Sequence, residues 1–227
     1  MAAGEGRRLR PLTERWPKPV LPVDGRPVVA MLLRELSHAG IERAWVVTGH
    51  LGEQVEALVG DGTAFGLDIA YARQPEPLGS ADAFRRALEA GAAPPLLATA
   101  ADTVYRRGDL ARAAAGWLAS QAAGGLGVRV GGHAGQTPVH VEDGLVQAIG
   151  GERPTDRSGA PLWFLAAELV GELDGLPGPP YELAQAFRGA VERGRSIAAL
   201  ELGPTRDLTQ PEDIVRENFP YLWRWDG

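Results

Sequence analysis

Residues 2–13 of the chain read AAGEGRRLRPLT, and residues 17–23 read PKPVLPV. The first stretch has two glycines after its alanines, and glycine lets backbone N–H groups close around a phosphate. Arg7, Arg8 and Arg10 add positive charge to the same loop. The stretch lacks the Gly-Lys-Ser/Thr of a P-loop and the third glycine of the dinucleotide-binding fingerprint. Taken by itself, a Gly-x-Gly loop of this kind is more often a solvated basic surface loop.

The second stretch holds Lys18, the only lysine among 23 basic residues. A compositional bias from lysine to arginine, sparing one position by chance, is one explanation. The other is that position 18 needs a compact ammonium group, which a planar guanidinium cannot replace. Composition alone leaves both open.

The 227 residues are 44% hydrophobic and 23% charged, as in ordinary globular proteins. This length fits one large domain, so we expect residues 1–227 to form a single domain. The absence of cysteine excludes disulfides, thiolate metal sites and cysteine nucleophiles. The net charge of −6 disfavours a nucleic-acid partner. No apolar stretch is as long as a membrane span and no signal peptide is visible, so we expect a cytoplasmic protein without a membrane partner.

Apolar periodicity predicts alternating strands and helices through the first half of the chain. We expect helices over residues 27–39, 53–59, 80–90, 109–122, 181–193 and 212–218. We expect strands over residues 44–48, 68–72, 95–99 and 197–202, with a further apolar run at 162–166. This alternation favours an α/β fold with a mostly parallel sheet and helices on both faces. Short glycine-separated runs between residues 126 and 148 suggest a small β insertion or an edge β region.

The two opening stretches together resemble the signature of the sugar-1-phosphate nucleotidyltransferases, or nucleotide-sugar pyrophosphorylases. That signature reads Ala-Ala-Gly-x-Gly-x-Arg-Leu-x-Pro-Leu-Thr, followed after a short gap by Pro-Lys-Pro and an apolar Pro-Val. The resemblance implies the Rossmann-like sheet of nucleotide-diphospho-sugar transferases. It also implies that Ala3, Gly4 and Gly6 belong to a loop around a nucleoside triphosphate. Arg8 would hold the phosphates, and Lys18 would stabilise charge at the reacting phosphates.

Two further segments are similar to motifs of the same family. Residues 74–81, QPEPLGSA, resemble a Gln-x-x-x-x-Gly-Thr-Ala motif in which Gln74 and Gly79 meet the base, with Ser80 in place of threonine. Taken alone, Gln74 is more often a surface-loop residue. Residues 96–102, LLATAAD, resemble an apolar strand ending in Gly-Asp, which makes Asp102 a catalytic metal ligand. Ala101 stands in place of the usual glycine.

Residues 206–213, RDLTQPED, resemble more weakly an Asp-x-Gly-Thr-Pro-Glu-Asp motif. The resemblance makes Asp207 a second metal ligand; the alternative is that Asp207 caps the last helix. Asp102 and Asp207 would then form one Mg²⁺ site, because magnesium prefers oxygen ligands and usually takes one or two carboxylates. Substrate phosphate oxygens and water would complete the shell.

Nucleotidyl transfer depends mainly on positioning and charge stabilisation. The sugar phosphate, already an anion at neutral pH, would attack the α-phosphorus in line, and pyrophosphate would leave. No side chain need act as a base. The sequence agrees with this, because it has no Ser-His-Asp pattern and no histidines at metal-ligand spacing.

Glu152, Arg153 and the proline that follows resemble the family's Glu-Lys-Pro, in which the glutamate meets sugar hydroxyls and the basic residue meets the sugar phosphate. Arg153 keeps the charge of the family's lysine but changes its geometry. Pro161 departs from the small-residue segment that the family has before its next strand. Taken alone, Glu152 and Arg153 are an ordinary charge pair on a loop.

The family has an apolar strand directly before its Ala-Ala-Gly, in the middle of the sheet, whereas only Met1 precedes Ala2 here. We therefore expect the first strand to be missing, through truncation or an internally assigned start, with sheet hydrogen-bonding groups left open. The resemblance runs to about Asp213. It implies the short form of the family, without a C-terminal β-helix.

We therefore expect a Mg²⁺-dependent enzyme that joins a nucleoside triphosphate and a sugar 1-phosphate into a nucleoside-diphosphate sugar. N-acetylmuramate-1-phosphate uridylyltransferases and short mannose-1-phosphate guanylyltransferases are of similar size, and a phosphocholine cytidylyltransferase is an alternative. The rival hypothesis is a regulator that binds nucleotides or sugar nucleotides on the same fold, supported by the missing first strand, by Ala101 and by the altered segment after Asp207. It gains if the carboxylates of Asp102 and Asp207 lie far apart in the folded chain. The aromatic tail is expected to pack onto the domain or to form a homo-oligomer contact: Phe219, Tyr221, Trp223 and Trp225.

Overall fold

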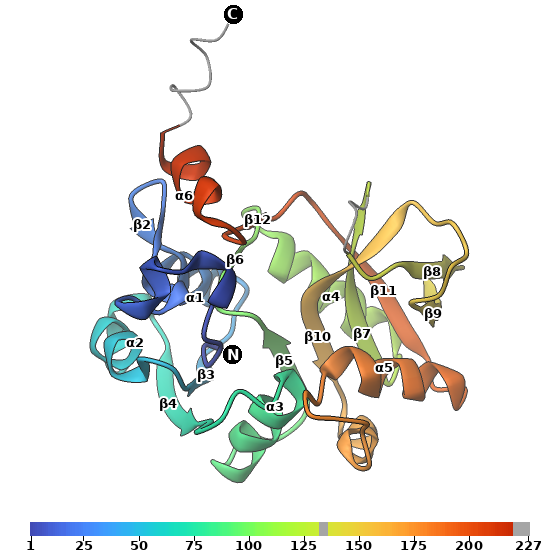
Figure 1. Cartoon of the computed structure of the whole chain (residues 1–227). Helices are drawn as coiled ribbons and strands as arrows, with labels where there is room; N and C mark the ends of the chain where they lie inside the picture. The colour runs from blue at the N-terminus through green and yellow to red at the C-terminus, as the bar shows by residue number, and fades with distance from the viewer. Residues whose placement is uncertain (132–135, 220–227) are drawn as a thin grey trace, which may run out of the picture.

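The computed structural model describes residues 1–131 and 136–219 (Figure 1). Its largest sheet has six strands in the order β5-β10-β7-β11-β9-β8, and β3 and β4 form a separate parallel pair. The strands are β3 (Arg43–Thr48), β4 (Asp68–Arg73), β5 (Leu96–Thr99), β7 (Gly124–Val130), β8 (Val139–Glu142), β9 (Leu145–Ile149), β10 (Arg157–Leu165) and β11 (Ile197–Leu202). Because β10 is antiparallel to both β5 and β7, those two strands share one direction with β11. The expected mostly parallel α/β sheet is confirmed.

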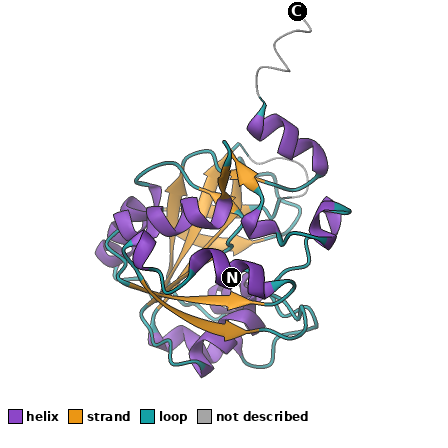
Figure 2. Cartoon of the chain, turned by 90° about the vertical axis from the view of Figure 1, so that its left-hand side faces the viewer, coloured by secondary structure: helices purple, strands orange, loops and turns teal. Residues whose placement is uncertain are grey.

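Helices lie on both sides of the strands (Figure 2). They are α1 (Val28–His38), α2 (Gly52–Val59), α3 (Ser80–Glu89), α4 (Asp109–Ser120), α5 (Leu183–Glu192) and α6 (Pro211–Asn218). Strand β10 contributes side chains to the core on both faces of the sheet. Leu162 and Phe164 pack with α1 and α4, whereas Trp163 and Leu165 pack with α3 and α5. Alternate side chains of a strand point to opposite faces, so this apolar run is that of a strand buried on both sides.

None of these helices, within the described part of the chain, combines the length and the hydropathy needed to cross a lipid bilayer.

The first three residues connect the two sheets. Ala2 N–H donates to the Val47 carbonyl of β3 at 2.7 Å, and Ala101 N–H, just beyond β5, donates to the Met1 carbonyl at 2.8 Å. Figure 1 shows the N-terminus between β3 and β5. Residues 1–3 therefore occupy the position of a strand between these two edges, with a single parallel bridge, from Ala2 to Thr48.

The glycine-rich middle of the chain divides into two parts. The β8–β9 hairpin lies at the edge of the sheet, as expected, but β7 lies in its centre between β10 and β11, so the expectation was wrong for β7. The sequence of β7, GGLGVRV, reflects close packing. A Cβ on Gly127 would lie 2.9 Å from the Cβ of Leu162 on β10.

The sequence patterns did not predict several short strands and 3-10 helices. β1 (Pro22–Val23) pairs with β2 (Arg26–Pro27), and β6 (Thr103–Val104) pairs with β12 (Arg206–Asp207). Short 3-10 helices include η1 (Arg7–Leu9), η2 (Leu12–Glu14) and η3 (Lys18–Val20). The β6–β12 pair places the segment before α6 beside the carboxyl end of β5. The aromatic tail beyond Phe219 lies outside the described residues.

The packing of β7 gives a stability prediction. We expect Gly127→Ala to lower the free energy of unfolding by about 1–3 kcal/mol through overpacking, because the new methyl meets Leu162 and Leu202. Gly171, which has open space around it, provides the matched control: Gly171→Ala should change stability by less than about 0.5 kcal/mol. Urea denaturation measures both. Equal, small effects would mean that β7 is not packed as closely as described.

Candidate active site at the carboxyl end of β5

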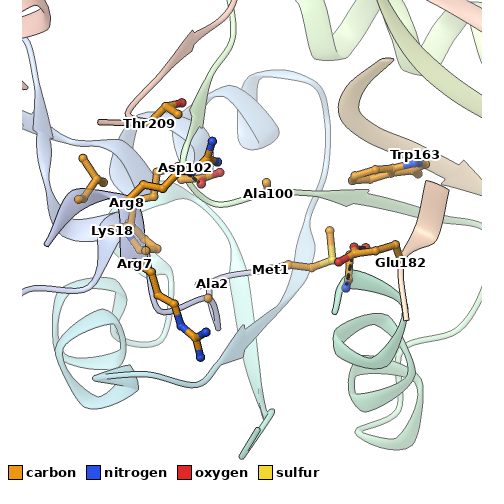
Figure 3. A pocket seen from close by; sticks show the side chains of 15 residues that line it. Met1, Ala2, Arg7, Arg8, Lys18, Ala100, Asp102, Trp163, Glu182 and Thr209 are labelled. Carbon is orange, nitrogen blue, oxygen red and sulfur yellow. Dashed lines mark hydrogen bonds and ion pairs between the residues drawn. The ribbon is translucent and has the colours of Figure 1, made fainter. Parts of the chain in front are cut away.

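A cavity of about 430 Å³ opens at the carboxyl end of β5 (Figure 3). Its walls come from the glycine loop, the start of η3, the segment after β5, β10 and the residue before α5. Six predicted site residues line it: Gly4, Gly6, Arg8, Lys18, Ser80 and Asp102. This is the position in which α/β sheets bind ligands, outside the carboxyl ends of the strands.

Residues 4–13 form a closed loop. Gly6 has φ +62°, and a Cβ there would lie 2.8 Å from Thr13 Cγ2, so both conformation and space favour glycine. The Thr13 hydroxyl donates to the Gly6 carbonyl at 2.9 Å, and a ring nitrogen of His50 donates to the Thr13 carbonyl at 2.7 Å. His50 N–H donates to the Ala3 carbonyl at 3.3 Å. These three hydrogen bonds hold the loop in shape: one closes it from Thr13 to Gly6, and two join its flanks, Ala3 and Thr13, to His50.

The three loop arginines differ in their partners. Arg7 Nε lies 2.7 Å from a Glu5 carboxylate oxygen, and Arg10 lies 3.5 Å from the same oxygen. The hydrogen bond from Arg7 holds the pKa of Glu5 below its usual value. Arg8 is exposed, lines the cavity, and makes no hydrogen bond or ion pair within the described residues. Arg8 is therefore the loop cation left available to an anionic ligand.

Lys18 and Asp102 form an ion pair at the cavity wall. Lys18 begins η3, and Asp102 lies between β5 and β6. The two side chains are 15% and 29% exposed, so water is partly excluded while the pair stays open to the cavity. Figure 3 shows Arg8, Lys18 and Asp102 gathered on one side of the cavity. Ala101 is buried in the core, so its methyl group does not enter this space.

Asp207 lies on the strand next to Asp102. The β6–β12 register sets Asp207 opposite Thr103, the residue after Asp102. Asp207 accepts a hydrogen bond from Arg129 at 3.2 Å and one from Thr205 at 3.1 Å. Each of the two carboxylates thus has a cationic neighbour.

The alternative role for Asp207, capping the last helix, is wrong. Gln210 is the N-cap of α6, and its side chain and that of Asp213 form a reciprocal capping box. Within residues 1–131 and 136–219, no group of three or more acidic or histidine side chains is placed to hold a metal. A site formed by the two aspartates with substrate oxygens stays a prediction.

Tyr105, three residues after Asp102, is buried in the core. Its hydroxyl donates to the Pro161 carbonyl at 3.1 Å and lies 2.8 Å from Thr99 Oγ1. Burial raises the pKa of Tyr105, and the negative charges of Asp207 and Asp102 raise it further. Both carboxylates are therefore within electrostatic reach of one buried hydroxyl.

Residues 74–80 form a second loop with a fixed shape. Gln74 is buried, not on the surface, and its side-chain amide donates to the Gly79 carbonyl at 2.9 Å and to Asp82 at 2.8 Å. Gly79 has φ +103°, and a Cβ there would lie 2.3 Å from the Tyr181 carbonyl oxygen. Gln74 and Gly79 thus shape the loop that leads into α3. Their contact with a nucleotide base stays a prediction.

Ser80 meets Glu182 at the cavity wall. The Ser80 hydroxyl donates to the Glu182 carboxylate, and Ser80 N–H donates to it at 3.2 Å. Ser80 Oγ in turn accepts from Leu183 N–H at 2.8 Å. The sequence analysis did not predict Glu182 as a site residue. The Glu-x-x-Gln spacing of Glu182 and Gln185, which form a capping box at the start of α5, is the sequence pattern that marks this position.

Other lining residues were not predicted, among them Trp163 and Thr209, and six predicted site residues do not line the cavity: Ala3, Gln74, Gly79, Glu152, Arg153 and Asp207. Trp163 of β10 and Thr209 line the cavity, and Trp163 follows Pro161 in the segment that departs from the family pattern. Glu152 and Arg153 are exposed on the loop between β9 and β10 and are not among the cavity-lining residues. Their role toward a sugar phosphate stays a prediction.

The comparisons with known proteins agree with this picture. The family model described as "Nucleotidyl transferase" matches residues 1–136. An N-acetylmuramate alpha-1-phosphate uridylyltransferase of Neisseria meningitidis is 46% identical over 79 residues, which are 35% of this chain and 33% of that protein. A mannose-1-phosphate guanylyltransferase of Mycobacterium tuberculosis is 44% identical over 80 residues, 35% of this chain and 22% of that protein.

The likeness in three dimensions extends further along the chain. A UTP-bound UGPase from Acinetobacter baumannii superposes with a TM-score of 0.79, covers 97% of this chain and 90% of its own, and is 21% identical. At that identity the likeness shows the fold. The matched sequence spans a third or less of the length of the two curated relatives.

The Arg129–Asp207 contact gives a second stability prediction. Arg129 is 15% exposed and also donates to Thr205 and to the Gly159 carbonyl. We expect Arg129→Ala to lower the free energy of unfolding by about 1–3 kcal/mol, because it leaves these acceptors unpaired. Arg157→Ala, which removes pairs to two mostly exposed carboxylates, should cost less than about 1 kcal/mol. Equal losses in chemical denaturation would contradict this account.

Proposed function

The chain belongs to the nucleotidyl transferase family, and on that premise we propose that it transfers a nucleotidyl group from a nucleoside triphosphate to a sugar 1-phosphate. An oxygen of the sugar phosphate attacks the α-phosphorus. The bond from the α-phosphorus to the oxygen bridging to the β-phosphate breaks, and pyrophosphate leaves. The products are a nucleoside-diphosphate sugar and pyrophosphate. In this proposal residues 1–227 act as one catalytic domain.

The observation that carries the proposal is the grouping of Arg8, Lys18 and Asp102 beside the glycine loop in one cavity. The loop offers backbone N–H groups, and Arg8 offers a guanidinium that has no partner in residues 1–131 and 136–219. Lys18 places a compact ammonium against Asp102. Fixed positive charge of this kind stabilises the charge that develops on a transferring phosphoryl group.

Asp102 and Asp207 are the residues that would hold Mg²⁺. Asp207 lies on β12, and Asp102 directly precedes β6, the strand that pairs with β12. Both side chains are about a third exposed and present carboxylate oxygens, the ligand type that Mg²⁺ prefers. When bound, the ion would neutralise phosphate charge. Lys18 and Arg129 are the neighbours that would keep the two carboxylates in place. The donor set therefore fits magnesium.

The remaining predicted residues divide between the two substrates. Gln74, Gly79 and Ser80 are proposed for the nucleotide, because Gln74 and Gly79 shape the loop that leads to Ser80, and Ser80 lines the cavity. Glu152 and Arg153 are proposed for the sugar phosphate. They belong to a loop between β9 and β10, and they would have to close toward the cavity when substrate binds.

The rival hypothesis of a non-catalytic regulator would gain if Asp102 and Asp207 lay far apart. The pairing of β6 with β12 directly beside Asp102 does not favour it. The phosphocholine cytidylyltransferase alternative uses the same triphosphate chemistry with a different acceptor. A substrate screen separates all three.

Pyrophosphate release in the presence of Mg²⁺, across the common nucleoside triphosphates and sugar 1-phosphates plus phosphocholine, tests the proposal. We expect release with one nucleotide–sugar pair, and a loss of at least roughly a hundredfold in Asp102→Ala, as for removal of a key electrostatic group. Asp174, an exposed acidic residue away from the cavity, is the matched control, and Asp174→Ala should keep full activity. Nucleotide binding without release from any pair would favour the regulator.

The unpaired Arg8 predicts a selective effect on nucleotide affinity. We expect Arg8→Ala to weaken triphosphate binding by roughly 10- to 100-fold, the value of a charged hydrogen bond of about 1.5–3 kcal/mol. Arg7→Ala should change affinity by less than about threefold, because Arg7 is exposed and already paired with Glu5. Titration calorimetry measures both. An Arg7 effect as large as that of Arg8 would show that the loop binds through its overall charge.

A further inference from the structure

The carboxylate of Asp207 receives two hydrogen bonds, and both reach the same oxygen. Arg129 Nη1 donates to Asp207 Oδ2 at 3.2 Å, and the Thr205 hydroxyl donates to Asp207 Oδ2 at 3.1 Å. Within residues 1–131 and 136–219, the other oxygen, Oδ1, accepts no hydrogen bond. Each oxygen of an ionised carboxylate offers about two lone-pair sites. Two donors therefore use Oδ2, whereas Oδ1 is open to a ligand.

The direction of the Thr205 hydroxyl is set by Arg129. Arg129 Nη1 donates to Thr205 Oγ1 at 2.6 Å. A guanidinium has donors and no acceptor, so Thr205 must accept from Arg129 and use its single hydrogen toward Asp207. The three side chains thus form a closed triangle of hydrogen bonds with only one possible set of directions.

The triangle is anchored on a strand in the centre of the largest sheet. Arg129 lies on β7, opposite Ser158 of β10 and Leu202 of β11. Its second terminal nitrogen, Nη2, donates to the Gly159 carbonyl at 3.1 Å, and its side chain is mostly buried. A guanidinium that bonds to three separate acceptors has little freedom to turn. Arg129 is therefore a fixed reference point for Asp207.

The pairing of β12 with β6 fixes the backbone of Asp207 but not its carboxylate. Asp207 lies opposite Thr103 in this pair of two-residue strands. An aspartate side chain still turns about two bonds, and the bond to its carboxylate has broad minima, so it can present either oxygen or both. Arg129 and Thr205 select one of these orientations.

We propose that Arg129 and Thr205 are positioning residues that reserve Oδ1 of Asp207, and Oδ1 alone, for a divalent cation. This inference rests on the proposed function, in which Asp102 and Asp207 hold Mg²⁺. Groups that hydrogen-bond to a metal ligand orient it, and their loss typically costs about 10- to 100-fold in metal affinity or activity. A single oxygen from Asp207 suits Mg²⁺, which demands octahedral geometry and keeps positions for substrate phosphate and water.

Thr205→Val tests the proposal, because valine is close to threonine in size, lacks the hydroxyl and leaves every charge in place. The probe is Mn²⁺ alone, which takes the same oxygen ligands as Mg²⁺ and is followed by its electron paramagnetic resonance. We expect Thr205→Val to weaken Mn²⁺ binding roughly 10-fold, as for loss of one such hydrogen-bonding partner. Thr205→Ser restores the hydroxyl and should bind Mn²⁺ as the unaltered chain does.

Thr63 provides the matched control. Its backbone N–H and its hydroxyl both hydrogen-bond to Asp61, and they hold the pKa of that carboxyl below its usual value. Thr63 is exposed and does not line the cavity, so Thr63→Val removes the same kind of hydrogen bond elsewhere and should leave Mn²⁺ binding unchanged. In the pyrophosphate assay, Thr205→Val should raise the Mg²⁺ concentration needed for half-maximal release, with kcat at saturating Mg²⁺ little changed.

Asp207→Asn separates a failure of this inference from a failure of the proposed metal site. Loss of Mn²⁺ binding in Asp207→Asn, together with full binding in Thr205→Val, would overturn the positioning role and leave the proposed function intact. Full Mn²⁺ binding in Asp207→Asn would remove Asp207 from the metal site and overturn both. Equal losses in Thr205→Val and Thr205→Ser would show that the hydroxyl does not orient Asp207, which also overturns the proposal.

Discussion

The arrangement of the site depends on the backbone pairing of residues 1–3 with two separate sheets. Ala2 bonds to Val47 of β3, and Ala101, beyond β5, bonds to Met1. These bonds fix where the chain leaves the sheet, and the glycine loop begins at the next residue. Gly49 permits the approach, because a Cβ there would lie 2.6 Å from the Ala3 carbonyl oxygen. The loop therefore opens beside the carboxyl end of β5, where Asp102 lies.

The charges around the cavity follow from this placement. Asp102 pairs with Lys18, and Asp207 pairs with Arg129, so each carboxylate has a cation beside it. Each cation lowers the electrostatic repulsion between the two carboxylates, which lie on neighbouring segments of the chain. Arg8 remains unpaired within the described residues and turns toward the cavity. The cavity therefore offers one unpaired cation to an anionic ligand, such as the triphosphate of the proposed function.

The sequence predicted well what local patterns determine. The six expected helices and the strands at 44–48, 68–72, 95–99 and 197–202 correspond to observed elements, because apolar periodicity and capping act over a few residues. Local patterns could not predict that β7 lies in the centre of the sheet. Its glycines are typical of a loop, and their place in a strand is explained only by close packing, as of Gly127 against Leu162 and Leu202. The β6–β12 pair joins two-residue strands about a hundred positions apart, and no local signal marks it. Glu182 was missed for a similar reason, because its contact with Ser80 joins two helix starts.

Amide hydrogen exchange with and without a nucleoside triphosphate and Mg²⁺ tests the central claim most directly, namely that residues 1–3 anchor a nucleotide-binding loop between the two sheets. We predict that the Ala2 and Ala101 amides exchange as slowly as those of β3 and β5 in both states. The nucleotide should slow exchange in residues 4–13, and little elsewhere. Fast exchange at Ala2 and Ala101, or nucleotide protection confined to a region outside the glycine loop and the cavity, would contradict the account.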